Sequence, residues 1–120
     1  MYENDAAAAF LDVNPRSPGH TMVVPKEHCA TILELPAHCS EGFIEAIKET
    51  ARRLQRALEP DGFTMGINHG RVSGQVVDHL HFHIMPRFEG DGGGSIHSVV
   101  NNSPEESLGD IAEKIRRLDV

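Results

Sequence analysis

The sequence predicts an α+β protein whose sheet is antiparallel. Residues 40–58 have the apolar spacing of a long helix, and several short segments have the apolar character of strands. These elements follow one another in mixed order, without the regular alternation of strand and helix that is typical of a parallel sheet. The chain has 120 residues, enough for one domain with a core of its own.

The N-terminal part contains the first strand candidates. Residues 5–13 fit either a strand or a short helix by propensity. Residues 14–19 read NPRSPG, which is a turn sequence. Residues 21–24 then predict a short strand that Pro25 ends.

Residues 40–58 are the clearest helix in the chain. Apolar side chains recur at steps of three and four residues, which forms one stripe along a helix: Phe43, Ile44, Ile47, Ala51, Leu54 and Leu58. Basic residues lie off the stripe and are interpreted as a solvated face. The sequence Pro-Asp-Gly at residues 60–62 ends the helix.

The second half predicts two more strands and a last helix. Residues 63–68 and 76–85 are the strands, and Pro86 caps the second one. Residues 90–94 (GDGGG) form a mobile linker without a phosphate-loop pattern. Residues 107–118 predict a helix with an apolar face of Leu108, Ile111, Ile115 and Leu118.

Composition and charge exclude several functions. The net charge of −7 disfavours a nucleic-acid polymer as partner, although a mononucleotide needs only a local site. No apolar run is long enough for a membrane helix, and the N-terminus lacks the features of a signal peptide. The expected location is the cytoplasm, where Cys29 and Cys39 stay reduced thiols.

Three histidines with a two-residue period mark the second of these strands. Side chains alternate along a strand, so His79, His81 and His83 are predicted to share one face. Imidazoles in this pattern bind a metal or act as nucleophile, acid and base near neutral pH. A cupin-like metal site needs a nearby glutamate, and Glu89 lies beyond Pro86. Both chemistries remain open, and loss of activity to a chelator would indicate the metal.

Three segments carry a resemblance to a known family. Residues 74–87 read GQVVDHLHFHIMPR, residues 9–15 read AFLDVNP, and residues 18–28 read PGHTMVVPKEH. Together they resemble the histidine triad (HIT) superfamily, bacterial HIT hydrolases first, over about residues 2–91. The resemblance implies a HIT-like fold, with an antiparallel sheet of about five strands, one long helix and a C-terminal helix. Residues 1–90 would form the HIT domain core, and residues 91–120 the glycine linker and helical segment of the same domain.

The resemblance also implies catalytic roles for four histidines. His81 would attack an α-phosphate and carry the nucleotidyl group, which splits one displacement into two steps. The main-chain carbonyl of His79 would orient that imidazole. His83 would bind the phosphate, and His20 would assist the leaving group.

The nucleoside would be held by residues near the first turn. Asp12 would accept both ribose hydroxyls, and Phe10 and Val13 would line the base pocket. Asn68 matches an asparagine that reaches toward the ribose and the phosphate. Asp12 as a turn-forming residue and Phe10 as ordinary core are the alternative interpretations.

The phosphate would be held by Gln75 and by backbone N–H groups near Val76. The nucleotide-binding branch of the family has a serine where this chain has Val76. The missing hydroxyl favours dinucleoside polyphosphate hydrolysis over phosphoramidase activity.

The function indicated is hydrolysis, or nucleotidyl transfer, at the α-phosphate of an adenine nucleotide through a nucleotidyl-histidine intermediate. The substrate would be a dinucleoside polyphosphate or a nucleoside phosphoramidate, and the enzyme a homodimer with one nucleotide site per subunit. The alternatives are a nucleotide-binding regulatory protein with incidental catalysis and a metal-binding protein. No cofactor is expected.

The sequence also departs from the resembled family at a structural zinc site, where two of the four ligands are missing. Bacterial members often have a Cys-x-x-Cys before the segment aligned with Tyr2, and its thiolates bind zinc together with two histidines. Those histidines match His28 and His79, but no cysteine pair precedes Tyr2. Structural zinc sites normally have four protein ligands. We expect a protein without zinc for the sequence as given. The alternative is that the start of the chain was assigned too far downstream and an upstream cysteine pair was lost.

Overall fold

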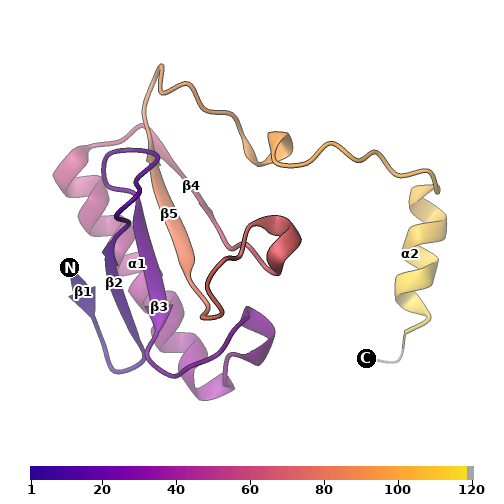
Figure 1. Cartoon of the computed structure of the whole chain (residues 1–120), viewed down its shortest axis with the longest axis horizontal. Helices are drawn as coiled ribbons and strands as arrows, with labels where there is room; N and C mark the ends of the chain where they lie inside the picture. Colours follow the sequence, from indigo (N-terminus) through magenta and orange to yellow (C-terminus); the bar gives the residue numbers. More distant parts are fainter. Residues whose placement is uncertain (119–120) are drawn as a thin grey trace.

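The five strands form a single antiparallel sheet in the order β1-β2-β3-β5-β4, and the long helix lies against it (Figure 1). The computed structural model describes residues 1–118. The elements are β1 (Tyr2–Glu3), β2 (Ala7–Leu11), β3 (Thr21–Pro25), α1 (Ala37–Leu58), β4 (Gly62–Gly66), β5 (Phe82–Arg87) and α2 (Leu108–Arg116), with short 3-10 helices at Ile32–Glu34, Arg71–Ser73 and Ile96–Ser98. The α+β class and the five-stranded antiparallel sheet are confirmed, and residues 5–13 contain a strand rather than a helix.

Helix α1 covers one face of the sheet. It contacts β1, β2, β3 and β5 through buried residues that include Phe43, Ile47 and Leu54. It begins at Ala37 rather than at residue 40, because Pro36 already occupies the N-cap position. Ile44 was predicted on the apolar stripe but is 51% exposed. Glu59 ends the helix in the left-handed conformation.

The two faces of the sheet differ in what covers them and in which side chains they carry. In β3, residues 21, 23 and 25 are buried under α1, while Met22 and Val24 point the other way. In β5, Ile84 is buried on the helix side, and His83 lies opposite Met22 in the register. The face away from α1 therefore carries the side chains of the candidate site.

Strand β5 differs from its prediction at both ends. It begins only at Phe82, so His79 and His81 precede the strand and the expectation of three histidines on one strand face is wrong. The segment before Phe82 bonds instead to the loop after β3, where the N–H of Leu80 donates to the carbonyl of Cys29 (2.7 Å).

Pro86 was predicted to cap β5 but lies within the strand, opposite Phe63 of β4. The N and C=O of one strand residue point to the same side. The carbonyl of Pro86 accepts from the hydroxyl of Ser17 (2.6 Å), on the side where pairing with β3 ends at Ile84. The backbone nitrogen of Pro86 points to this same side, away from β4. The N–H that proline lacks would therefore not have bonded to β4.

The C-terminal segment leaves the sheet, and helix α2 stands apart from it (Figure 1). Ser107 caps α2 by accepting from the N–H of Asp110 (3.1 Å). Leu108, Ile115 and Leu118 are each at least 65% exposed, so the predicted apolar face does not join the core of this chain. Residues 119 and 120, the end of the predicted segment, lie outside the described residues. No helix within residues 1–118 has both the length and the apolar character to cross a membrane.

Candidate active site

His81 is held by the main chain immediately before it. Its Nδ1 lies 2.8 Å from the carbonyl oxygen of His79. A carbonyl only accepts, so the proton of neutral His81 is on Nδ1 and the lone pair is on Nε2. This arrangement leaves the lone pair of Nε2 free, and the carbonyl of His79 orients the ring as the resemblance implied.

A second hydrogen-bonded chain runs beside His81. The backbone N–H of Arg16 donates to Nδ1 of His20 (3.1 Å), so the proton of His20 is on Nε2. That nitrogen lies 2.9 Å from Nδ1 of His83, and a carboxylate oxygen of Asp12 lies 3.5 Å from it. His20 therefore donates to His83, which keeps its own proton on Nε2. The rings of His81 and His83 are 5.0 Å apart.

Both histidines of this chain are uncharged near neutral pH. Burial lowers the pKa of His20, which Asp12 partly opposes and Arg16 reinforces. Burial also lowers the pKa of His83, with further lowering from His81 and His20. The electrostatics agree with the hydrogen bonds, because a protonated His20 has no lone pair for the N–H of Arg16.

An apolar hollow of about 280 Å³ lies in front of His81 and is lined by Phe10, Met22, Val24, Val77, His79 and His81. Phe10 therefore faces the triad rather than the core, as a base-binding residue would. Val13 is 88% exposed and lies outside this hollow, so the structure does not bring it to the predicted base pocket.

A second hollow of about 450 Å³ adjoins His83 on the β4 side of the site. Its polar lining includes Asp12, Asn14, Arg16, His20, Asn68 and His83. The two carboxylate oxygens of Asp12 have different partners. One accepts from the N–H of Asn14 (2.8 Å) and stabilises the turn, and the other faces His20 and His83. Asp12 thus stabilises the turn and also lines this hollow, and Asn68 lines the same hollow.

Comparisons with known proteins decide the family. The HIT domain family matches residues 1–90. The chain belongs to the HIT family. It is 49% identical over 92 residues to an uncharacterized HIT-like protein of Methanocaldococcus jannaschii, which covers 77% of this chain and 70% of that protein.

A solved structure and a named enzyme extend the comparison. The crystal structure of a HIT family protein from Bacillus subtilis matches with a TM-score of 0.83 and 32% identity, over 100% of this chain and 87% of that one. A protein of Schizosaccharomyces pombe named adenosine 5′-monophosphoramidase is 37% identical over 87 residues, 72% of this chain and 62% of its own length.

Gln75 has a different place from the one that the HIT resemblance implied. It is buried, its Nε2 donates to the carbonyls of Ala30 (2.7 Å) and Val77 (3.2 Å), and its Oε1 accepts from the N–H of Gly70 (2.9 Å). Both amide N–H groups are occupied, so Gln75 as placed offers none to a phosphate oxygen. It stabilises the loop that leads to the triad, because an unpaired buried amide is costly.

The preceding Gly74 and the following Val76 complete this loop. Gly74 has a φ of +108°, a backbone conformation that residues other than glycine rarely adopt. Val76 is 89% exposed and offers no side-chain hydroxyl, so only its backbone N–H remains as a phosphate donor.

His28 and His79 form a second imidazole pair. Their Nδ1 atoms lie 3.0 Å apart, and Nε2 of His79 donates to the carbonyl of Pro25 (2.9 Å). The two histidines that the resemblance matched to zinc ligands are thus close together. Among residues 1–118, no third His, Cys, Asp or Glu donor groups with this pair. The described residues do not form the closed four-ligand site that structural zinc requires.

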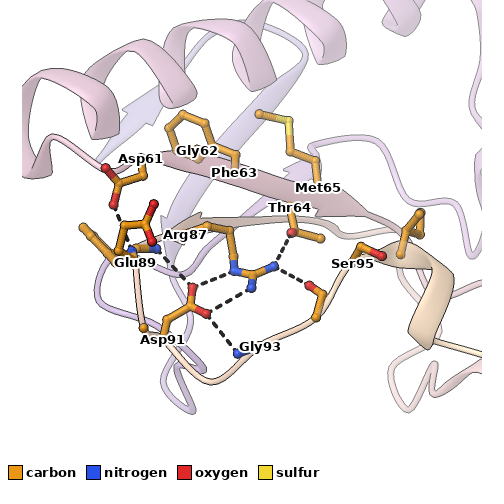
Figure 2. A pocket seen from close by; sticks show the side chains of 14 residues that line it. Asp61, Gly62, Phe63, Thr64, Met65, Arg87, Glu89, Asp91, Gly93 and Ser95 are labelled. Atoms are coloured by element: carbon orange, nitrogen blue, oxygen red, sulfur yellow. Dashed lines mark hydrogen bonds and ion pairs between the residues drawn. The ribbon is translucent and has the colours of Figure 1, made fainter.

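A larger hollow, about 810 Å³, lies elsewhere and contains no histidine. Figure 2 shows its centre, where Arg87 bonds both oxygens of Asp91 (2.7 and 3.0 Å) as well as Thr64 and the carbonyl of Gly94. This ion pair holds the pKa of Asp91 far below its usual range and anchors the start of the glycine linker. Four of the five N–H donors of the guanidinium are used, and the acidic lining of Asp61, Glu89 and Asp91 does not suit a phosphate.

Sequence reasoning missed three contributors to the site. Met22 and Val24 line the apolar hollow, and the period of two along residues 21–25 would have placed them opposite the core. The backbone N–H of Arg16, which sets the proton position on His20, has no signal in the sequence because any residue but proline supplies an N–H.

Proposed function

We propose that this protein hydrolyses adenine nucleotides at the α-phosphate, with His81 as the nucleophile and dinucleoside polyphosphates as the substrate class. The observation that carries the proposal is the hydrogen bond from Nδ1 of His81 to the carbonyl of His79, which leaves the lone pair of Nε2 free beside a neutral His20–His83 pair. Covalent catalysis by an imidazole fits this arrangement.

In the first step, Nε2 of His81 forms a bond to the α-phosphorus, and the bond from phosphorus to the bridging oxygen breaks. The bridging oxygen takes the electron pair and leaves on a phosphate anion. His83 donates the hydrogen bond of its Nε2–H to the phosphate, and His20 holds the other nitrogen of His83. Both histidines donate hydrogen bonds without losing their only proton.

In the second step, water attacks the phosphorus of the nucleotidyl-His81. The N–P bond breaks and its electron pair returns to Nε2, while the proton of the water passes to solvent. The products are AMP and the nucleoside polyphosphate that left in the first step. His81 returns to its starting state, with the proton still on Nδ1.

A neutral relay favours leaving groups that depart as anions. A phosphate leaving group needs no proton, whereas the amine of a phosphoramidate does. The absence of a hydroxyl at Val76 supports the same preference. Nucleoside phosphoramidates are the second candidate, favoured by the S. pombe relative named adenosine 5′-monophosphoramidase.

The test is a panel of diadenosine triphosphate, diadenosine tetraphosphate and adenosine 5′-phosphoramidate, ranked by kcat/KM. The dinucleoside polyphosphates should rank first, and mass spectrometry of quenched reactions should find AMP attached to His81. A chelator should leave the rate unchanged. A ranking led by the phosphoramidate would contradict the substrate class, and a missing adduct would contradict the nucleophile.

We also propose a homodimer in the cytoplasm, as the HIT resemblance implies. The exposed apolar residues of α2 and the edge strand β4, which pairs only with β5, are available for a second subunit. A single mass equal to the monomer by light scattering at micromolar concentration would contradict the dimer.

A further inference from the structure

Three metal-binding side chains meet at the start of α1, away from the triad. Glu27 comes from the loop after β3, and His38 and Cys39 lie in the first turn of the helix. A carboxylate oxygen of Glu27 lies 3.1 Å from Nε2 of His38 and 3.4 Å from the sulfur of Cys39. The three donor atoms lie within 4.8 Å of one another.

These distances fit the edges of a tetrahedral zinc site. Zinc bonds of about 2.0 Å to N or O and about 2.3 Å to S, at tetrahedral angles, place ligand atoms about 3.3 to 3.5 Å apart. The contact of Glu27 with Cys39 (3.4 Å) has this length, and its contact with His38 (3.1 Å) is slightly shorter. A mixed set of thiolate, imidazole and carboxylate selects zinc-like ions over Mg²⁺ and Ca²⁺, which prefer oxygen ligands alone.

The burial of the three residues gives the cluster an inner and an outer side. Cys39 is buried, whereas the side chains of His38 and Glu27 are 75% and 51% exposed. An ion between them would have the sulfur beneath it and solvent above it. Water would then fill the fourth position, as in zinc sites with three protein ligands.

We propose that Glu27, His38 and Cys39 bind one divalent ion of the zinc class, with water as the fourth ligand. The site shares no residue with the His28–His79 pair and does not depend on the catalytic proposal. Because Glu27 lies in the loop after β3 and His38 and Cys39 lie in the first turn of the helix, the ion would tie that loop to α1. The same loop supports the triad, since Cys29 and Ala30 accept from Leu80 and Gln75.

The experiment is a Co²⁺ titration of the full chain after chelator treatment, followed by absorbance. Cobalt bound by a thiolate gives an intense near-ultraviolet band that nitrogen and oxygen ligands do not give. The unsubstituted protein should develop this band with one ion per chain, and Zn²⁺ should displace it. Ion binding to the folded state alone should also raise the Tm.

The variants separate this site from its neighbours. Cys39→Ser should abolish the band, and Glu27→Gln or His38→Gln, both at exposed side chains, should weaken Co²⁺ binding by at least about tenfold. The matched controls Cys29→Ser and His28→Asn should retain it. A missing band in the unsubstituted protein, a band that survives Cys39→Ser, or a band lost only in Cys29→Ser would overturn the proposal. Circular dichroism checks that each variant is folded.

Discussion

The two histidine pairs of this protein have nearly the same geometry in different surroundings. In the His20–His83 pair the nearest nitrogens are 2.9 Å apart and the ring centroids 5.1 Å. In the His28–His79 pair the corresponding distances are 3.0 and 5.1 Å. The first pair has the carboxylate of Asp12 beside it and a buried His20, whereas His28 is exposed.

The difference teaches that contact between two imidazoles does not decide their role. In the first pair, the N–H of Arg16 sets the proton positions and burial keeps both rings neutral. In the second, His79 is turned toward Pro25, and its carbonyl orients His81. The surroundings therefore make the first pair a hydrogen-bond relay, whereas the second pair reaches His81 through the main-chain carbonyl of His79 and not through the imidazole of His28.

The largest effect is expected at His81, which lies between the two pairs. His81→Ala should lower kcat/KM by at least about a thousandfold, because neither pair offers another imidazole with a free, oriented lone pair. The unfolding free energy should change little, since His81 is only partly buried. Steady-state hydrolysis and urea unfolding check both. A rate close to that of the unsubstituted protein would show that the nucleophile is another residue.

The difference between the two pairs is tested by substituting one histidine of each pair, the buried His20 and the exposed His28. His20→Asn should lower kcat about a hundredfold, because the relay loses the donor that holds His83. The matched variant His28→Asn should keep a kcat close to that of the unsubstituted protein. Equal losses in the two variants would mean that the buried pair has no special part in turnover.

A smaller effect is expected from Asp12, the carboxylate that distinguishes the pairs. Removing one ribose hydroxyl from the ligand should cost about 1 to 3 kcal/mol, because the acceptor at Asp12 then lacks a partner. Calorimetry should find that 2′-deoxy-AMP binds at least severalfold more weakly than AMP. Asp12→Asn should reduce this difference. If AMP and 2′-deoxy-AMP bind equally well, Asp12 does not contact the ribose.

The smallest effect is the pH dependence of stability. The pKa values of His20 and His83 are lowered in the folded state, so the unfolded chain binds more protons below an ordinary histidine pKa of 6.5. The unfolding free energy should therefore fall as the pH drops through about 6.5. Urea unfolding of His83→Gln should show a shallower fall than that of the unsubstituted protein. An unchanged slope in His83→Gln would contradict the assignment.

Local pattern determined much of this protein. The three- and four-residue apolar period of α1 and the strand character of β3 depend on residues close in sequence, so they were predicted almost in place. The α+β class followed from their order. The HIT resemblance of the motif around His81 also implied that the carbonyl of His79 orients that imidazole, and the structure has this hydrogen bond.

Only the tertiary structure decided which groups meet across the chain. Gln75 bonds to Ala30 rather than facing a phosphate, and β5 starts at Phe82 because the preceding residues bond to the loop after β3. The apolar stripe of α2 was visible in the sequence, but periodicity does not say whether a core or a second subunit covers it. The contact between Glu27 and His38 could not be predicted from the sequence either. It joins a loop to the start of a helix, and such a contact depends on how the whole chain packs.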